Sequence, residues 1–213
     1  MKLFYRLALL AVSSVGYIVN AVADDLNLKY STNYLMPAYV HFNNNAGKYK
    51  IESRINIPLY KIQFIAQGRD NNSRLSLDSY KDVRNGKNYA IVELGSNSIQ
   101  YGKVKEPLKK ESLSLPTFDL FSLVFQLSYY DKLPSSFQTT NGKKLYPSEN
   151  VNLDKSQAKV KLNGKDVDQI TYKFRADDKF FTIKKLVGEK FPRYVLYTRD
   201  DDKYELTFDG FVQ

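Results

Sequence analysis

Hydrophobic and polar residues alternate along most of the chain, which is the pattern of β-strands that are buried on one face. Between residues 47 and 57, charged side chains occupy one face of the expected strand, and the other face carries Tyr49, Ile51, Ile55 and Ile57. The same alternation recurs in residues 88–94, 98–104, 169–174 and 203–208. The pattern therefore predicts a mainly β protein, and no repeat or linker divides it.

Short polar segments separate these strands and predict hairpin turns. Asn-Gly pairs occur at residues 85–86, 141–142 and 163–164. Both residue types tolerate the positive φ angles that tight hairpin turns require. Two acidic clusters, residues 177–178 and 200–202, also lie between strand patterns. A cation site there is conceivable, but the spacing matches no calcium loop and Asp is common in turns, so we interpret both clusters as turns.

One segment, residues 115–134 (LPTFDLFSLVFQLSYYDKLP), breaks the alternation and predicts an α-helix of about residues 117–131. Thr117 can cap its first turn, and Asp119 favours the positive end of the helix dipole. A helix of ~15 residues is roughly 22 Å long, which is too short to span a bilayer. Apolar residues fill nearly all of its circumference, so we expect it to be buried between two β-meanders.

The first 23 residues have the features of a secretory signal peptide. Lys2 and Arg6 supply a cationic start, residues 7–19 are apolar and uncharged, and Ala21–Ala23 supplies small residues for cleavage before Asp24. An uncleaved anchor is the alternative, but an apolar run of 13 residues is short against the ~20 that a membrane span needs. We therefore expect export to the periplasm, no stable membrane span after cleavage, and a single domain of residues 24–213.

The residue types exclude several kinds of site. The chain has no cysteine, so we expect neither a lipoprotein anchor nor a disulfide. His41 is the single histidine, which excludes multi-His metal sites. It lies in a strand pattern with no partner motif, so we expect no His-based triad and interpret it as an ordinary strand residue. Ser156 and Lys159 have Ser-x-x-Lys spacing, but they lie in an alternating segment without the companion motifs of penicillin-recognising enzymes. We expect no catalytic residue, no metal ligand and no cofactor, and hence a protein that is not an enzyme.

The chain is basic, with a formal net charge of +9. Loss of residues 1–23 would remove two positive charges, those of Lys2 and Arg6, and no negative ones, which leaves +7. An exported basic protein meets anionic lipid surfaces and envelope polymers rather than nucleic acid. We therefore expect lipid or an envelope protein, and no nucleic acid, as the partner.

The order of four segments, GKYKIESRINI, RLSLDSYKDVRNGKNYAIVEL, FDLFSLVFQL and FPRYVLYTRDDDKYELTFDGF, resembles the bacterial exported family known as domain of unknown function 3108. Asp119 and Ser122 stand at that family's Asp–Ser positions, and Pro192 and Arg193 stand at its Pro–basic position. The resemblance covers residues 30–208. It implies a curved antiparallel sheet, an incomplete β-barrel, in the periplasm. Such a shape is similar to the half-barrels of lipoprotein carriers, although the motifs of those carriers are absent here.

Two functions are compatible with this fold. In the first, a lipid or acyl chain binds in the concave face of the half-barrel, lined by the helix residues Leu120, Phe121, Val124 and Phe125. In the second, helix and sheet fill each other completely, and the protein is a structural or interaction protein of the cell envelope without a ligand. The hydrophobic period does not distinguish a packed core from a lined cavity, so both hypotheses stand at this point.

Overall fold

The computed structural model describes residues 24–34 and 36–213, and the predicted signal peptide lies outside the described residues. These residues form sixteen strands and one helix. The elements are β1 (Asp24–Thr32), β2 (Ala38–Asn45), β3 (Lys48–Ile57), β4 (Tyr60–Asp70), β5 (Leu75–Arg84), β6 (Lys87–Leu94), β7 (Ser98–Lys103), β8 (Lys109–Ser112), β9 (Thr117–Phe118), α1 (Leu120–Tyr130), β10 (Phe137–Thr140), β11 (Leu145–Ser148), β12 (Asp154–Leu162), β13 (Lys165–Ala176), β14 (Lys179–Leu186), β15 (Tyr194–Arg199) and β16 (Asp202–Phe211). The prediction of a mainly β protein with one helix is confirmed.

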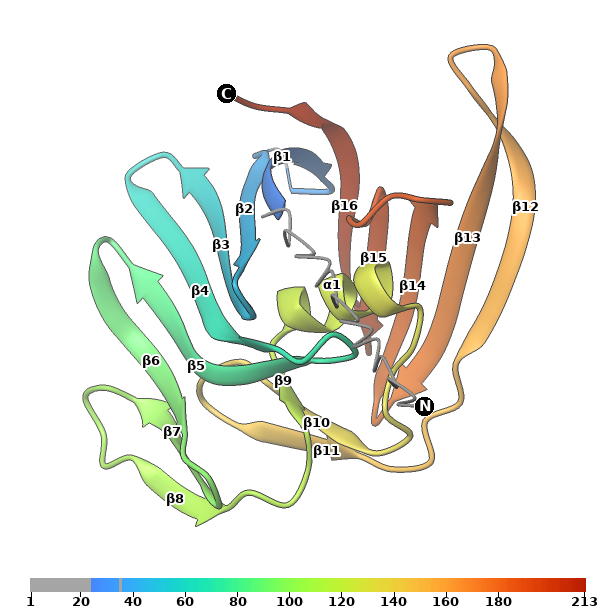
Figure 1. Cartoon of the computed structure of the whole chain (residues 1–213). Helices are drawn as coiled ribbons and strands as arrows, with labels where there is room; N and C mark the ends of the chain where they lie inside the picture. The colour runs from blue at the N-terminus through green and yellow to red at the C-terminus, as the bar shows by residue number, and fades with distance from the viewer. Residues whose placement is uncertain (1–23, 35) are drawn as a thin grey trace, which may run out of the picture.

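Thirteen strands form one sheet in the order β12-β13-β14-β15-β16-β1-β2-β3-β4-β5-β6-β7-β8. The two meanders belong to this same sheet because β16 pairs antiparallel with β1. The sheet curves around α1 without closing, so that β12 and β8 are its edges (Figure 1). The curved, unclosed sheet that we predicted is therefore confirmed. A smaller sheet, β11-β10-β9, lies below the helix in the view of Figure 1.

The hairpin turns lie at the Asn-Gly pairs and acidic clusters of the sequence. In the β5–β6 turn Asn85 and Gly86 have φ angles of 48° and 76°, as two-residue hairpins with paired left-handed residues require. The pair at 163–164 turns β12 into β13 in the same way, and the pair at 141–142 connects β10 to β11. Asp177 and Asp200, with φ of 58° and 49°, form the β13–β14 and β15–β16 turns. The turn interpretation of both acidic clusters is confirmed.

Helix α1 begins three residues later than the sequence predicts. Thr117 is extended because it pairs with Gln138 of β10, so our assignment of Thr117 as the cap is wrong. Asp119 is the N-cap: its carboxylate accepts from the amides of Phe121 and Ser122, at 3.0 and 3.1 Å. The Ser122 hydroxyl accepts from the Asp119 amide at 2.9 Å, which completes a capping box. Within the described residues no helix is long and apolar enough to cross a membrane.

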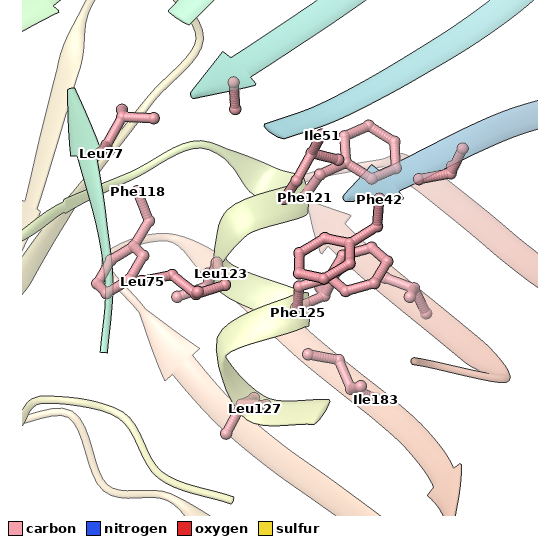
Figure 2. Packing of buried hydrophobic residues seen from close by; sticks show 14 of the residues in the cluster. Phe42, Ile51, Leu75, Leu77, Phe118, Phe121, Leu123, Phe125, Leu127 and Ile183 are labelled. Atoms are coloured by element: carbon pink, nitrogen blue, oxygen red, sulfur yellow. The ribbon is translucent and has the colours of Figure 1, made fainter. Parts of the chain in front are cut away.

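The core lies between α1 and the concave face of the sheet. Every residue from Phe121 to Ser128 is buried, as the apolar circumference of the helix predicts. The rings of Phe125 and Phe42 stack with their centroids 4.4 Å apart and their planes 3° from parallel. Figure 2 shows helix and strand side chains meeting in this core, including Leu75 and Ile183 from strands on opposite sides of the helix. Segments that are distant in sequence therefore share one apolar cluster.

Candidate functional site

Two neighbouring clefts open beside the β4–β5 turn, and Arg74 of that turn lines both of them. The larger has a volume of about 530 Å³, and the smaller a volume of about 410 Å³. Five leucines line the larger cleft, from β5, from the end of β6 and from the segment that leads to β9: Leu75, Leu77, Leu94, Leu113 and Leu115. The rest of its lining is largely polar and includes Arg69, Arg74 and Thr117. The smaller cleft is bounded by the polar turn and by the loop after α1, with Lys132, Leu133 and Pro134. The pair therefore combines leucine-bearing, partly polar walls with a cationic mouth.

Gln126 of α1 holds the turn in place from inside the protein. Its side-chain oxygen accepts from the Leu75 amide at 2.8 Å, and its side-chain nitrogen donates to the carbonyl oxygens of Ser73 (3.2 Å) and Lys132 (3.1 Å). A buried amide with every one of these bonds made is rigid, because breaking any of them leaves a desolvated polar group. Gln126 thus joins the mouths of the two clefts to the helix.

A glycine sets the path of β4 beside the larger cleft. The β4–β5 pairing shifts register between Gln67 and Gly68. A Cβ atom on Gly68 would lie 2.0 Å from the Ser76 carbonyl oxygen and 2.7 Å from the Tyr49 ring. Only glycine fits this close approach of two backbones, so the position of Ser76 and its leucine neighbours depends on it.

The mouth of the clefts carries positive charge that the protein leaves only partly neutralised. The Arg69 guanidinium donates twice to one carboxylate oxygen of Asp78, at 3.0 and 2.9 Å. Within the described part of the chain, Arg74 and Lys132 form no ion pair, and both are exposed. An exposed guanidinium that has no ion-pair partner among the described residues is suited to an anionic group such as a carboxylate or a phosphate.

The helix residues that we predicted to line a ligand site lie elsewhere. Phe121, Val124 and Phe125 are buried in the core, and Leu120 is half-buried against it. None of the four lines either cleft. Their contact with a ligand stays a prediction. The sequence signal that could have indicated the clefts is the leucine-rich, proline-bounded segment before the helix, which alternation alone does not distinguish from a linker.

Two inward-facing lysines on β14 are a feature that the sequence analysis missed. The Lys185 ammonium donates to the Ser128 carbonyl oxygen at 2.6 Å and lies 2.9 Å from the Asp131 carboxylate, at the negative end of the helix dipole. The Lys179 ammonium lies 3.6 Å from the centroid of the Tyr146 ring of β11, and burial lowers the pKa of this lysine. These contacts fix the helix and the small sheet to β14, and neither lysine lines the clefts.

His41 lies in β2, as predicted, and its Nε2 is 2.6 Å from an Asp25 carboxylate oxygen on β1. Among the described residues, neither side chain of this exposed pair forms a further ion pair. Over the residues that the structure describes, no group of three or more His, Cys, Asp or Glu side chains is arranged to hold a metal ion.

Comparison of the chain with family models, with curated proteins and with solved structures finds no match. The resemblance to the family with domain of unknown function 3108 therefore stays a prediction, and the functional argument depends on the clefts themselves.

Proposed function

We propose that this protein is a non-enzymatic binding protein of the bacterial periplasm whose ligand is an amphiphile, with an apolar chain in the leucine-lined cleft and an anionic head at Arg74. The observation that carries the proposal is the larger cleft itself. Its volume of about 530 Å³ lies within the range of roughly 300–1,000 Å³ that small-molecule sites usually have.

The cleft matches an acyl chain in chemistry as well as in size. Its leucines come from three separate segments, so a chain lying between them would be enclosed on several sides. Each methylene that leaves water contributes about 0.8 kcal/mol, so about ten buried methylenes supply the ~8 kcal/mol of micromolar binding before the cost of association is subtracted. A long acyl chain with a head group held at Arg74 is therefore the class of ligand that reaches this affinity. The exposed guanidinium at the mouth would hold the head group in contact with solvent.

The experiment is a titration of the full-length chain with a fluorescent long-chain fatty acid. Leu115→Gln places an amide in the wall of the larger cleft, and we expect it to weaken binding about tenfold through the lost apolar contact. Leu162→Gln is the matched control, because Leu162 is also a half-buried leucine but lies at the end of β12. Equal effects of the two changes, or no saturable binding by the unmodified chain, would refute the proposal.

A second candidate function is a structural or interaction protein of the cell envelope without a ligand. The observation that favours it is the packing beneath the helix, where Phe121, Val124 and Phe125 are all buried in the core. These side chains pack against other core residues, and their contact with a ligand stays a prediction. The two candidate functions therefore differ in whether the clefts beside Arg74 bind a ligand.

A further inference from the structure

The tip of the β3–β4 hairpin is apolar and exposed. Its two turn residues are Pro58 and Leu59. They connect Ile57 of β3 to Tyr60 of β4, and these two strand residues pair directly with each other. Leu59 is fully exposed and Ile57 is exposed as well, although both have large aliphatic side chains. No contact within the described protein accounts for a leucine at the outermost point of this hairpin.

The backbone at Leu59 makes this leucine still less expected. Its φ angle is 64°, in the left-handed region, where a residue following proline in a tight turn is usually Gly or Asn. Leucine is disfavoured there because its Cβ approaches the backbone carbonyl oxygen. A strained and fully exposed leucine stabilises neither the turn nor the core, so a contact outside this chain is the natural reason for it.

Two other hairpin tips lie beside this one on the same side of the sheet (Figure 1). The Asn85 amide of the β5–β6 turn donates to the Lys61 carbonyl oxygen at 2.9 Å, and the Lys61 amide donates to the Asn85 side chain at 2.8 Å. The Val104 amide of the β7–β8 loop donates to the Tyr89 carbonyl oxygen of β6 at 3.0 Å. Val104 is exposed, so two of the three tips present apolar side chains: Ile57 and Leu59 at the β3–β4 tip, and Val104 at the β7–β8 tip.

The charge around these tips is basic. Lys61, Lys87 and Lys105 are exposed and form no ion pair within the described residues. The nearest carboxylates are already paired: Asp82 with Arg84 at 3.0 Å, and Glu106 with Lys103 at 2.8 Å. The surface formed by residues 57–61, 84–87 and 103–106, which we call the hairpin-tip surface, therefore combines protruding aliphatic side chains with unneutralised lysines.

We propose that the hairpin-tip surface docks the protein on an anionic lipid bilayer, with Leu59 and Ile57 entering the interface and the lysines contacting the head groups. Aliphatic residues flanked by basic ones are the combination that binds membrane interfaces, and each lysine near an anionic surface adds to the attraction. A second copy of this chain is a poorer occupant, because two identical basic surfaces repel each other. The inference is independent of the ligand proposed for the clefts.

The test is co-sedimentation of the full-length chain with vesicles of phosphatidylglycerol and phosphatidylethanolamine, against vesicles of phosphatidylcholine, at an ionic strength of about 0.15 M, where the Debye length is about 8 Å. Leu59→Asn removes the apolar tip but suits the left-handed backbone, so it should fold at least as well as the unmodified chain in a thermal melt. We expect it to bind anionic vesicles about tenfold more weakly. The double variant Lys61→Glu, Lys87→Glu should lose about 25-fold or more, at roughly fivefold for each lysine.

Matched controls separate the tips from the rest of the surface. Val187→Asn changes another exposed aliphatic turn residue, after β14, and Lys159→Glu with Lys165→Glu makes the same change of charge on the β12–β13 hairpin. Neither control should alter binding by more than about twofold once the long-range change of net charge is screened. All variants are made in the same full-length chain, so any effect of residues 1–23 is common to them.

Three results would overturn the proposal. The first is no binding of the unmodified chain to anionic vesicles. The second is equal loss in the tip variants and in the controls. The third is unchanged binding of Leu59→Asn beside weakened binding of the lysine variant, which would indicate general electrostatic attraction without insertion.

Discussion

Phe125→Ala measures whether the underside of α1 is a packed core or the wall of a ligand site. The Phe125 side chain is 1% exposed and its ring stacks on that of Phe42 at 4.4 Å. Truncation of a fully packed phenylalanine costs about 3–5 kcal/mol, loss of a stacked pair included, and we expect a value in the middle of this range, about 4 kcal/mol. For a domain of this size that corresponds to a fall in Tm of roughly 8–16 °C.

The assay is a denaturant melt of the unmodified chain and of Phe125→Ala, with fatty-acid binding measured on the same preparations well below the transition. We expect the large loss of stability together with unchanged affinity, because Phe125 lines neither cleft. Leu120→Ala is the matched control on the same helix, and it should cost much less because Leu120 is only half-buried. If Phe125→Ala loses less than about 1.5 kcal/mol of unfolding free energy and no longer binds the fatty acid, the packed-core argument is refuted. That result would indicate that the ligand binds against the helix.

Three further predictions test local features. Gly142→Val should destabilise more than Gly86→Val in urea melts, since both glycines have positive φ but only at Gly142 would a Cβ meet other atoms, 3.0 Å from Ala90; equal losses would contradict this. Burial disfavours ionisation of Asp131, but the Tyr172 hydroxyl and Lys185 outweigh it and lower its pKa. Asp131 therefore adds stability above pH ~4 that is lost as pH falls through the lowered pKa, and Asp131→Asn should flatten that acid limb. Intact-mass analysis of the periplasmic fraction should find a chain beginning at Asp24, and a chain that retains Met1 in the membrane pellet would refute this prediction.

The strands and turns could be predicted from sequence because their causes are local. Alternation sets which side chains face the core, and the Asn-Gly pairs set where the chain reverses, so β3 and the β5–β6 turn lie where the pattern places them. The pairing of β1 with β16 could not be predicted in this way, because no local signal links the two ends of the chain. The helix boundary was missed for a similar reason: Thr117 is held extended by β10, about twenty residues later.

The candidate site was less accessible to sequence reasoning than the fold. The rule that lysines on a half-buried strand face solvent fails at Lys185, whose ammonium is satisfied by the end of α1. The sequence gives Gln126 no role beyond its place in the predicted helix, and its role as a clamp depends on a turn some fifty residues earlier. Both cases are polar groups whose partners are distant in sequence, and period-2 patterns carry no information about such partners.

The most direct test of the central claim compares a long-chain fatty acid with the fatty alcohol of equal length, on the unmodified chain and on Arg74→Gln. Arg175→Gln is the matched control, since Arg175 is an exposed arginine on β13 that lines neither cleft. We predict that the acid binds about tenfold more tightly than the alcohol, that Arg74→Gln removes this difference, and that Arg175→Gln preserves it. Equal affinity of acid and alcohol for the unmodified chain, or the same loss in both arginine variants, would contradict an amphiphile site at Arg74.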